Sequence, residues 1–275
     1  MGGLIRRQPL GAAGLGIVII MVLLAVFADF ITVFDPELNA FHNMLLPPGA
    51  PFYLGTDQFG RDILSIIMSG AQNSITVGVV AVGIGLTFGI SLGLLASARR
   101  GWWEEVIMRM SDFMFAFPAI LLAIMLVATI GPGAVNAIVA IGIFSIPVFA
   151  RLTRGAANAV WAREFVLAAR SAGKGRFRIT IEHILPNIIS VIVVQVTIQF
   201  ALAILAEAAL SYLGIGSQPP TPSWGRMLSE AQTMIFLNPW LAVYPGLAIA
   251  LSVLGLNLLG DGLRDVIDPR LARKR

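Results

Sequence analysis

The sequence predicts an all-α, polytopic membrane protein with six transmembrane helices. Of its 275 residues, 57% are hydrophobic and only 12% are charged, against roughly 45–50% and about 25% in an ordinary soluble domain. The mean hydropathy is +0.85. A soluble fold of this length needs a charged surface to cover its core, and this chain has too few charged residues to make one. Lipid must therefore cover part of the protein.

Six apolar stretches are long enough, or nearly so, to cross a bilayer. A crossing helix needs about 20 apolar residues, because the hydrocarbon core is about 30 Å thick and each helical residue rises about 1.5 Å. The fourth stretch is short and contains Pro147, so we expect its ends to shift by several residues. The six stretches are Leu10–Ala28, Ser74–Ala98, Phe113–Ile130, Val135–Ala150, Ile188–Leu213 and Trp240–Leu259.

The first stretch has an alternative interpretation as a signal peptide, because Arg6 and Arg7 precede it. Its apolar run is longer than a usual signal-peptide core, and no convincing cleavage site precedes Asp29. These features favour a retained span.

The basic residues predict the orientation of the spans. If the N-terminus is cytoplasmic, all of the 19 Lys and Arg residues except Arg61 and Arg226 fall in cytoplasmic segments. Cytoplasmic loops carry such an excess of Lys and Arg, so both termini are predicted to be cytoplasmic. The asymmetry also explains the sequence pI of about 10.1 without a nucleic-acid partner.

The chain offers few residues for catalysis or for a metal site. It has no cysteine, and its two histidines are His42 and His183. A disulfide framework, a thiolate metal site and a cysteine nucleophile are excluded, and hydrolytic metal chemistry has almost no ligands. We therefore expect a protein that is not an enzyme and holds no metal.

The connecting segments suggest two units, residues 1–73 with one peripheral helix and an outside loop, and residues 74–275 with five core helices. Outside segments Asp29–Asn73 and Gly214–Pro239 carry prolines, which favour rigid loops. In the second span, Gly85, Gly89 and Gly93 are spaced by four residues, so we expect a neighbouring helix to pack closely there.

The most informative cytoplasmic segment covers about residues 156–187. Good helix formers from Ala156 to Ala172 predict a helix that stops at Gly173. A second short helix is expected from Arg176 to about Ile184, ended by Pro186. From the residues alone, docking of a partner protein and contact with lipid headgroups are equally good interpretations. The segment lacks the residues of a phosphate-binding loop, so this chain is not expected to bind ATP.

This segment resembles the cytoplasmic loop of bacterial ABC-importer permeases, which read Glu-Ala-Ala, three residues, Gly, nine residues, Ile-x-Leu-Pro. The chain departs from that pattern at Leu167, in place of Glu, and at His183, in place of Ile. Glu164 is a candidate for the missing carboxylate. The resemblance implies that ATPase docking uses Glu164, Ala168, Ala169, Gly173, Leu185 and Pro186.

Three further segments resemble the dipeptide, oligopeptide and nickel branch of that family, and the short first span resembles its second permease subunit. They begin at Gly55, Gln218 and Asn257. The first contains the loop motif residues Gly55, Asp57, Gly60, Arg61 and Asp62. We expect Asp57, Arg61 and Asp62 to pair among themselves or to contact a binding protein. Near the last helix end, we expect capping and anchoring by Asp261, Arg264, Asp265 and Asp268.

The resemblance implies a type I importer permease fold in the bacterial inner membrane. It also implies a heterodimer with a homologous permease, two cytoplasmic ATP-binding subunits that hold ATP and Mg²⁺, and an extracytoplasmic solute-binding protein. Di- or oligopeptides are the expected cargo, with nickel chelates or oligosaccharides as the alternative. An ATPase-independent channel or secondary transporter, or an intramembrane enzyme, are rival interpretations.

Polar residues within spans are candidates for the solute pathway, because exposing them to lipid is unfavourable. The fifth stretch carries Gln195, Gln199 and Glu207. They are expected either to line the pathway or to form hydrogen bonds with the partner subunit.

Overall fold

The computed structural model describes residues 8–267, and within that range the only β feature is one bridge between Thr56 and Asp62. The all-α prediction is confirmed. Several predictions fall on residues that lie outside the described range: Arg6, Arg7, Asp268 and the basic residues from Arg270 onward.

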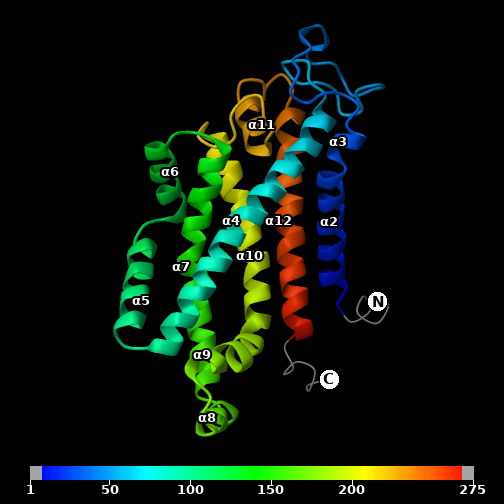
Figure 1. The fold of residues 1–275 in the computed structure, drawn as a ribbon. Coiled ribbons are helices and arrows are strands. Elements are labelled where there is room, and N and C mark those ends of the chain that lie inside the picture. Colours follow the sequence, from blue (N-terminus) through cyan, green and yellow to red (C-terminus); the bar gives the residue numbers. More distant parts are fainter. Residues whose placement is uncertain (1–7, 268–275) are drawn as a thin grey trace.

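Five long helices form the body of the molecule, and short helices join them (Figure 1). The long helices are α2 (Pro9–Val26), α4 (Ile63–Arg99), α7 (Ala134–Trp161), α10 (Leu185–Tyr212) and α12 (Trp240–Ile267). The shorter ones are α3 (Ala28–Ile31), η1 (Phe41–Asn43), α5 (Trp102–Phe115), α6 (Ala119–Ile130), α8 (Glu164–Ser171), α9 (Arg176–Ile179), η2 (Thr180–Ile184) and α11 (Trp224–Ala231).

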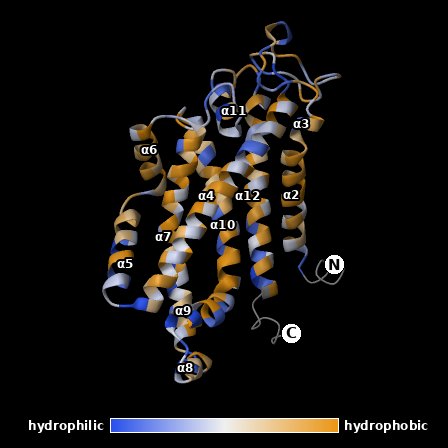
Figure 2. Ribbon diagram, in the orientation of Figure 1, coloured by the Kyte–Doolittle hydropathy of each residue, from blue (hydrophilic) through white to orange (hydrophobic). Residues whose placement is uncertain are grey.

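The bundle has two distinct ends. Helix α11 and the loop before α4 lie at one end, here the α11 end, whereas α8, α9, the start of α2 and the end of α12 lie at the other, the α8 end (Figure 1). Apolar residues dominate the long helices between the two ends, and hydrophilic residues gather near them (Figure 2). Within residues 8–267, five helices are long and apolar enough to cross a membrane, and the bent α5–α6 pair makes a sixth candidate if it counts as one span.

The third predicted span is the main error in the fold. A single helix from Phe113 to Ile130 is wrong, because α5 ends at Phe115 and α6 starts at Ala119 with a bend of 89° between them. Pro118 is the N-cap of α6. Proline has no N–H to donate and disfavours helical backbone at the preceding residue, here Phe117.

Two segments that were predicted to lie outside the membrane are more helical than predicted. Helix α4 begins at Ile63, so the loop expected to reach Asn73 ends earlier. Asp62 is the N-cap, and its carboxylate accepts a hydrogen bond from the Ser65 N–H at 2.9 Å, which satisfies a free donor of the first turn. The segment Gly214–Pro239 contains α11, a short helix and not a span.

Close packing of α4 on α7 confirms the role predicted for the three glycines of the second stretch. A Cβ atom on Gly85 would lie 2.4 Å from the Cβ of Ser145, and one on Gly89 would lie 2.5 Å from the Cβ of Phe149. A Cβ on Gly93 would lie 2.6 Å from the carbonyl oxygen of Ala150. Only glycine permits this helix separation.

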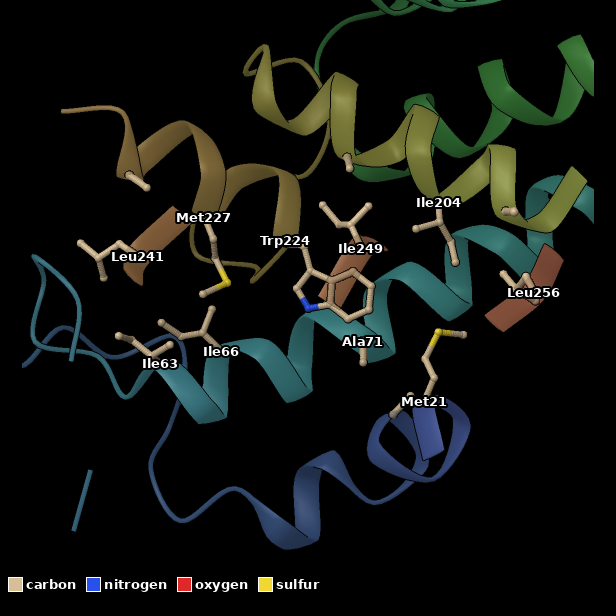
Figure 3. Close-up of a cluster of buried hydrophobic side chains, with 14 residues drawn as sticks. Met21, Ile63, Ile66, Ala71, Ile204, Trp224, Met227, Leu241, Ile249 and Leu256 are labelled. Carbon is tan, nitrogen blue, oxygen red and sulfur yellow. The ribbon is translucent and has the colours of Figure 1, made fainter. Parts of the chain in front are cut away.

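One of the apolar clusters joins α2, α4, α10, α11 and α12 toward the α11 end (Figure 3). Trp224 lies at its centre, 2% exposed, and its indole N–H donates to the Ile67 carbonyl at 2.9 Å. Ile63 and Ile66 from α4 and Met227 from α11 pack around it. The first helix is tied to the bundle by this cluster and by close approach of Gly11 to Gly262.

Candidate functional site

The predicted docking loop forms a projecting structure at the α8 end (Figure 1). The expected helix from Ala156 to Ala172 is wrong, because α7 runs to Trp161 and the backbone is extended at Arg163 before α8 begins at Glu164. The fourth predicted stretch, Val135–Ala150, therefore ended too early, because α7 continues to Trp161. This break lets α8 leave the direction of α7 and present its own face.

Gly173 ends α8 with a left-handed residue, φ +84°. The Gly173 N–H donates to the Arg170 carbonyl at 3.0 Å and the Lys174 N–H donates to the Ala169 carbonyl at 3.2 Å. These two bonds form a Schellman motif, in which the residue after the C-cap has positive φ and is usually glycine. The expected stop at Gly173 is confirmed, and its geometry accounts for the glycine.

One side of α8 is anchored and the other is open. Val166 is 1% exposed and packs with Ile179, Ile184 and Ile188, and Ala169 is half-buried against this cluster. The open side carries Glu164, Phe165, Leu167, Ala168 and Gly173, all exposed. Leu167 is 54% exposed, so the residue that replaces the family's Glu extends the apolar part of this open face.

The loop returns to the bundle through a widened turn. The prediction that Pro186 ends the second helix is wrong, because α9, η2 and α10 run on from Arg176 to Tyr212. The Leu185 N–H donates to the Thr180 carbonyl, five residues back, which is a π turn. Pro186 follows in the first turn of α10, and the π turn accommodates a residue that has no N–H to donate. Leu185 is half-buried and Pro186 is exposed.

Lys174 connects the end of the docking loop to this turn. Its Nζ lies 2.6 Å from Glu182 Oε2 and 3.1 Å from His183 Nε2. Arg178 also pairs with Glu182, at 2.5 Å. The Lys174 side chain is 31% exposed and lies between these two partners. His183, which departs from the family pattern, is one of them.

A cavity of about 250 Å³ lies between α6, α7 and α10. Its lining is apolar apart from Ser145 on α7 and Gln199 on α10. The Ser145 hydroxyl donates to the Ile141 carbonyl at 2.9 Å, which leaves Gln199 as the side chain able to offer both a donor and an acceptor. Of the three pathway candidates, the structure brings Gln199 to this cavity, and neither Gln195 nor Glu207 is among its lining residues.

Glu207 is 1% exposed and lies in a polar cluster at the α11 end of α10. Its Oε1 accepts hydrogen bonds from the hydroxyls of Ser211, at 2.7 Å, and Ser223, at 2.8 Å. Longer contacts of 3.4 Å come from Ser217 and from the amide of Asn73. We call these five residues the Glu207 cluster. Its partners belong to this chain, and three of the four are too distant in sequence to be predicted from it.

The loop motif before α4 folds around an ion pair. Arg61 Nη2 lies 2.6 Å from Asp57 Oδ2 and 2.6 Å from Glu230 Oε2 of α11. Glu230 also pairs with Arg226 at 2.7 Å. We call these four residues the Arg61 clamp. Asp62 was expected to join such a pairing but instead caps α4.

The two motif glycines shape the same loop. Gly55 and Gly60 have positive φ, and a Cβ on Gly60 would lie 1.8 Å from the Ala40 carbonyl oxygen. The motif is therefore a folding element that ties the loop to α11.

Near the end of α12, Asp261 and Asp265 are exposed, as is Arg264. Arg264 lies in the last turn of α12, where a cation interacts favourably with the helix dipole.

The chain is similar to known proteins in both sequence and fold. Residues 85–273 match the family model described as binding-protein-dependent transport system inner membrane component, and residues 5–48 match the N-terminal TM domain of oligopeptide transport permease C. The glutathione transport system permease protein GsiD of Escherichia coli O6:K15:H31 (strain 536 / UPEC) is 47% identical over 268 residues, which cover 97% of this chain and 88% of GsiD. GsiD of Shigella boydii serotype 4 (strain Sb227) matches to the same extent.

The fold is similar to that of a solved transporter. An inward-facing structure of the MetNI methionine ABC transporter aligns with a TM-score of 0.62 at 16% identity, covering 74% of this chain and 96% of the matched chain. This likeness concerns the fold alone. Together with the family match over most of the sequence, it shows that the chain belongs to the binding-protein-dependent transport system inner membrane component family and is a multi-pass inner-membrane permease subunit of an ABC importer.

Proposed function

We propose that this chain forms half of the pathway by which an ABC importer carries short peptides across the inner membrane, and that α8 is the site where an ATP-binding subunit docks. The observation that carries the proposal is the geometry of α8. One side is fixed to the bundle through Val166, and the other presents Ala168 and exposed apolar residues around a glycine-capped end. A short, capped helix of this kind is suited to fit a groove on a partner and to move with it.

The assembly that this function requires has several subunits. A homologous permease supplies the other half of the pathway, two cytoplasmic ATPases bind ATP and Mg²⁺, and an extracytoplasmic binding protein delivers the cargo. In this arrangement the permease chain itself binds no nucleotide. The α8 end faces the cytoplasm and both termini lie on that side, because the positive-inside rule assigns the Lys- and Arg-rich segments there.

Two observations support a short peptide as cargo. The curated relatives that match nearly the whole chain are named glutathione transport permeases, and glutathione is a tripeptide. The cavity next to α6 offers one amide side chain, Gln199, within an apolar lining. Such a lining can contact apolar side chains of a peptide while Gln199 bonds its backbone. Nickel chelates and oligosaccharides remain the alternatives to be compared.

Docking is tested by substituting the exposed face of α8 and leaving its anchored face unchanged. Ala168→Glu places a charge at the proposed contact, whereas Ala169→Glu would also disturb the packing of α8 on the bundle, because Ala169 is half-buried. We expect Ala168→Glu to insert normally in the membrane but to lose uptake and co-purification of the ATPases. Ala168→Ser is the matched control and should retain both. Full co-purification and uptake with Ala168→Glu would mean that α8 only lies on the lipid surface.

Cargo is tested by uptake into vesicles that hold the complete transporter. Labelled glutathione, a dipeptide panel and chelated nickel are compared at equal concentration. Saturable uptake of peptides alone is expected. Saturable uptake of nickel chelate without peptide uptake would overturn the cargo assignment and leave the permease assignment intact.

A further inference from the structure

The Glu207 cluster combines a buried carboxylate with polar groups from three segments of the chain. Glu207 and Ser211 belong to α10, Asn73 to α4, and Ser217 and Ser223 to the segment that leads into α11. Ser211, Ser217 and Ser223 are each 3% exposed or less. The cluster therefore lies in the interior and is distinct from the cavity beside Gln199.

The charge of Glu207 has no protein counter-ion. Every ion pair within the described range involves other groups: Arg61 pairs with Asp57 and Glu230, and Arg226 pairs with Glu230. Buried carboxylates in proteins are almost always paired with a cation or bound to a metal. The four partners of Glu207 are neutral, so hydrogen bonds alone stabilise the charge.

One oxygen of the carboxylate is also left without a partner. All four hydrogen bonds of the cluster converge on Oε1, whereas Oε2 is buried and accepts none. Buried polar atoms without a partner are rare in native structures, and one explanation is an ion. Oε2 is thus the oxygen of Glu207 that is free to contact a ligand of positive charge.

The donor set indicates what kind of ligand fits. One carboxylate and three serine hydroxyls are hard oxygen ligands, which suit hard cations. A monovalent cation neutralises the single carboxylate, whereas a divalent cation would leave one uncompensated positive charge in the interior. In the described part of the chain, no group of three or more His, Cys, Asp or Glu side chains is arranged for a metal ion, which also argues against a divalent site.

We propose that Glu207, Ser211, Ser217 and Ser223 form a binding site for a monovalent cation, Na⁺ or K⁺, that fixes the segment leading into α11 onto α10. The serines of this segment, Ser217 and Ser223, lie on either side of Pro219-Pro220. A cation bound by these two serines and by Glu207 would join the segment that leads into α11 to helix α10. This inference depends on the contacts within the chain and not on the cargo or on ATPase docking.

The experiment measures thermal unfolding of the full-length chain, purified in detergent with the subunits that accompany it. The midpoint is compared in sodium chloride, potassium chloride and choline chloride at constant ionic strength. A site filled about 20-fold over its dissociation constant should raise the midpoint by about 3–6 °C over choline chloride. Glu207→Gln should remove this ion-dependent rise, because its side chain has no charge to balance.

Two further variants keep the test decisive if Glu207→Gln fails to fold. Ser217→Ala removes one of the weaker contacts of the cluster and should shift the ion titration to several-fold higher concentration. Ser252→Ala is the matched control, because Ser252 is also a buried serine but bonds the Ala248 carbonyl on α12. Its titration should equal that of the unsubstituted protein.

Three results would overturn the proposal. The midpoint could be the same in all three salts, the ion-dependent rise could persist in Glu207→Gln, or Ser217→Ala could titrate like Ser252→Ala. A midpoint that follows pH but not the cation would assign the same position to a proton and equally exclude the cation. Because unfolding is measured without transport, these outcomes are separate from any failure of the proposed function.

Discussion

Replacing Gly173 with valine should uncouple the importer through the backbone and not through a steric clash within the chain. Gly173 has φ +84°, and a Cβ atom added there would meet no heavy atom within 4 Å. Ala169 is therefore not within reach of that Cβ. The cost therefore comes from placing a β-branched residue in the left-handed region, about 1–2 kcal/mol. This energy lowers the population of the capped α8 end about 5–30-fold.

Gly175 provides a matched control two residues away. Its φ is −68° and ψ 156°, an extended backbone that valine adopts readily, and a Cβ there also meets nothing within 4 Å. Gly175→Val thus adds the same side chain to the same loop without backbone strain. At equal membrane expression, we expect Gly173→Val to reduce uptake at least 5-fold and to weaken ATPase co-purification, and Gly175→Val to be much milder. Gly173→Asn should fall between them, because asparagine tolerates positive φ. Equal uptake in Gly173→Val and Gly175→Val would refute the reasoning.

Three further predictions concern other parts of the chain. Cysteines introduced at the exposed positions Tyr53 and Thr221 should react with an impermeant thiol reagent in intact cells, and a cysteine at Lys174 should not. Labelling at Lys174 alone would reverse the predicted orientation. Ser223 is unsuitable for this test because it is buried. Glu230→Gln should destabilise the protein by about 1.5–3 kcal/mol, since buried Arg61 would keep Asp57 but lose one of its two carboxylate partners, and Arg226 would lose its own. The exposed pair partner offers a control, because Glu105→Gln should change the free energy of unfolding by less than about 1 kcal/mol; similar unfolding midpoints in the two variants would contradict this. Gln199→Leu should change the KM for peptide uptake and leave ATPase co-purification intact, whereas an unchanged KM would remove Gln199 from the pathway.

The sequence was sufficient for the features set by local chemistry. Apolar length placed the helix bodies, because the bilayer requires it. The four-residue spacing of Gly85, Gly89 and Gly93 indicated a close helix contact, and the context of Gly173 indicated the end of a helix. Each of these follows from a residue and its near neighbours, so no knowledge of the remaining chain was needed.

Proline shows where local reasoning failed. Pro118 lies at the break between α5 and α6, where the chain bends by 89°. Pro147 lies inside α7, and Pro186 lies in the first turn of α10, directly after a π turn. The residue is the same, but the outcome depends on whether neighbouring elements satisfy the freed backbone groups. The sequence around each proline does not contain that information.

The polar sites failed for a related reason. Asp57 and Arg61, four residues apart, were foreseen as a pair, but Glu230, which completes the Arg61 clamp, is 169 positions from Arg61. Ser223 and Asn73 reach Glu207 from 16 and 134 positions away. Glu207 was therefore assigned to the pathway or to a contact with the partner subunit, since no local residue explained a buried acid. Its partners are brought together only by the packing of α4, α10 and the loop before α11.

Helix α10 joins the two regions that the proposals concern. At the α8 end, the π turn and the Lys174–Glu182 pair attach it to the docking loop. At the α11 end, Glu207 bonds Ser223, one residue before α11 begins. No further helix break is found between Leu185 and Tyr212, and a continuous packed helix moves as a rigid element. If an ATPase docks on α8 as proposed, we expect a displacement of α8 to travel along this single helix to the segment that leads into α11, and the Glu207 cluster to determine whether that segment follows. Conditions or variants that loosen that cluster should reduce transport while leaving ATPase docking unchanged, which separates transmission of the movement from its origin.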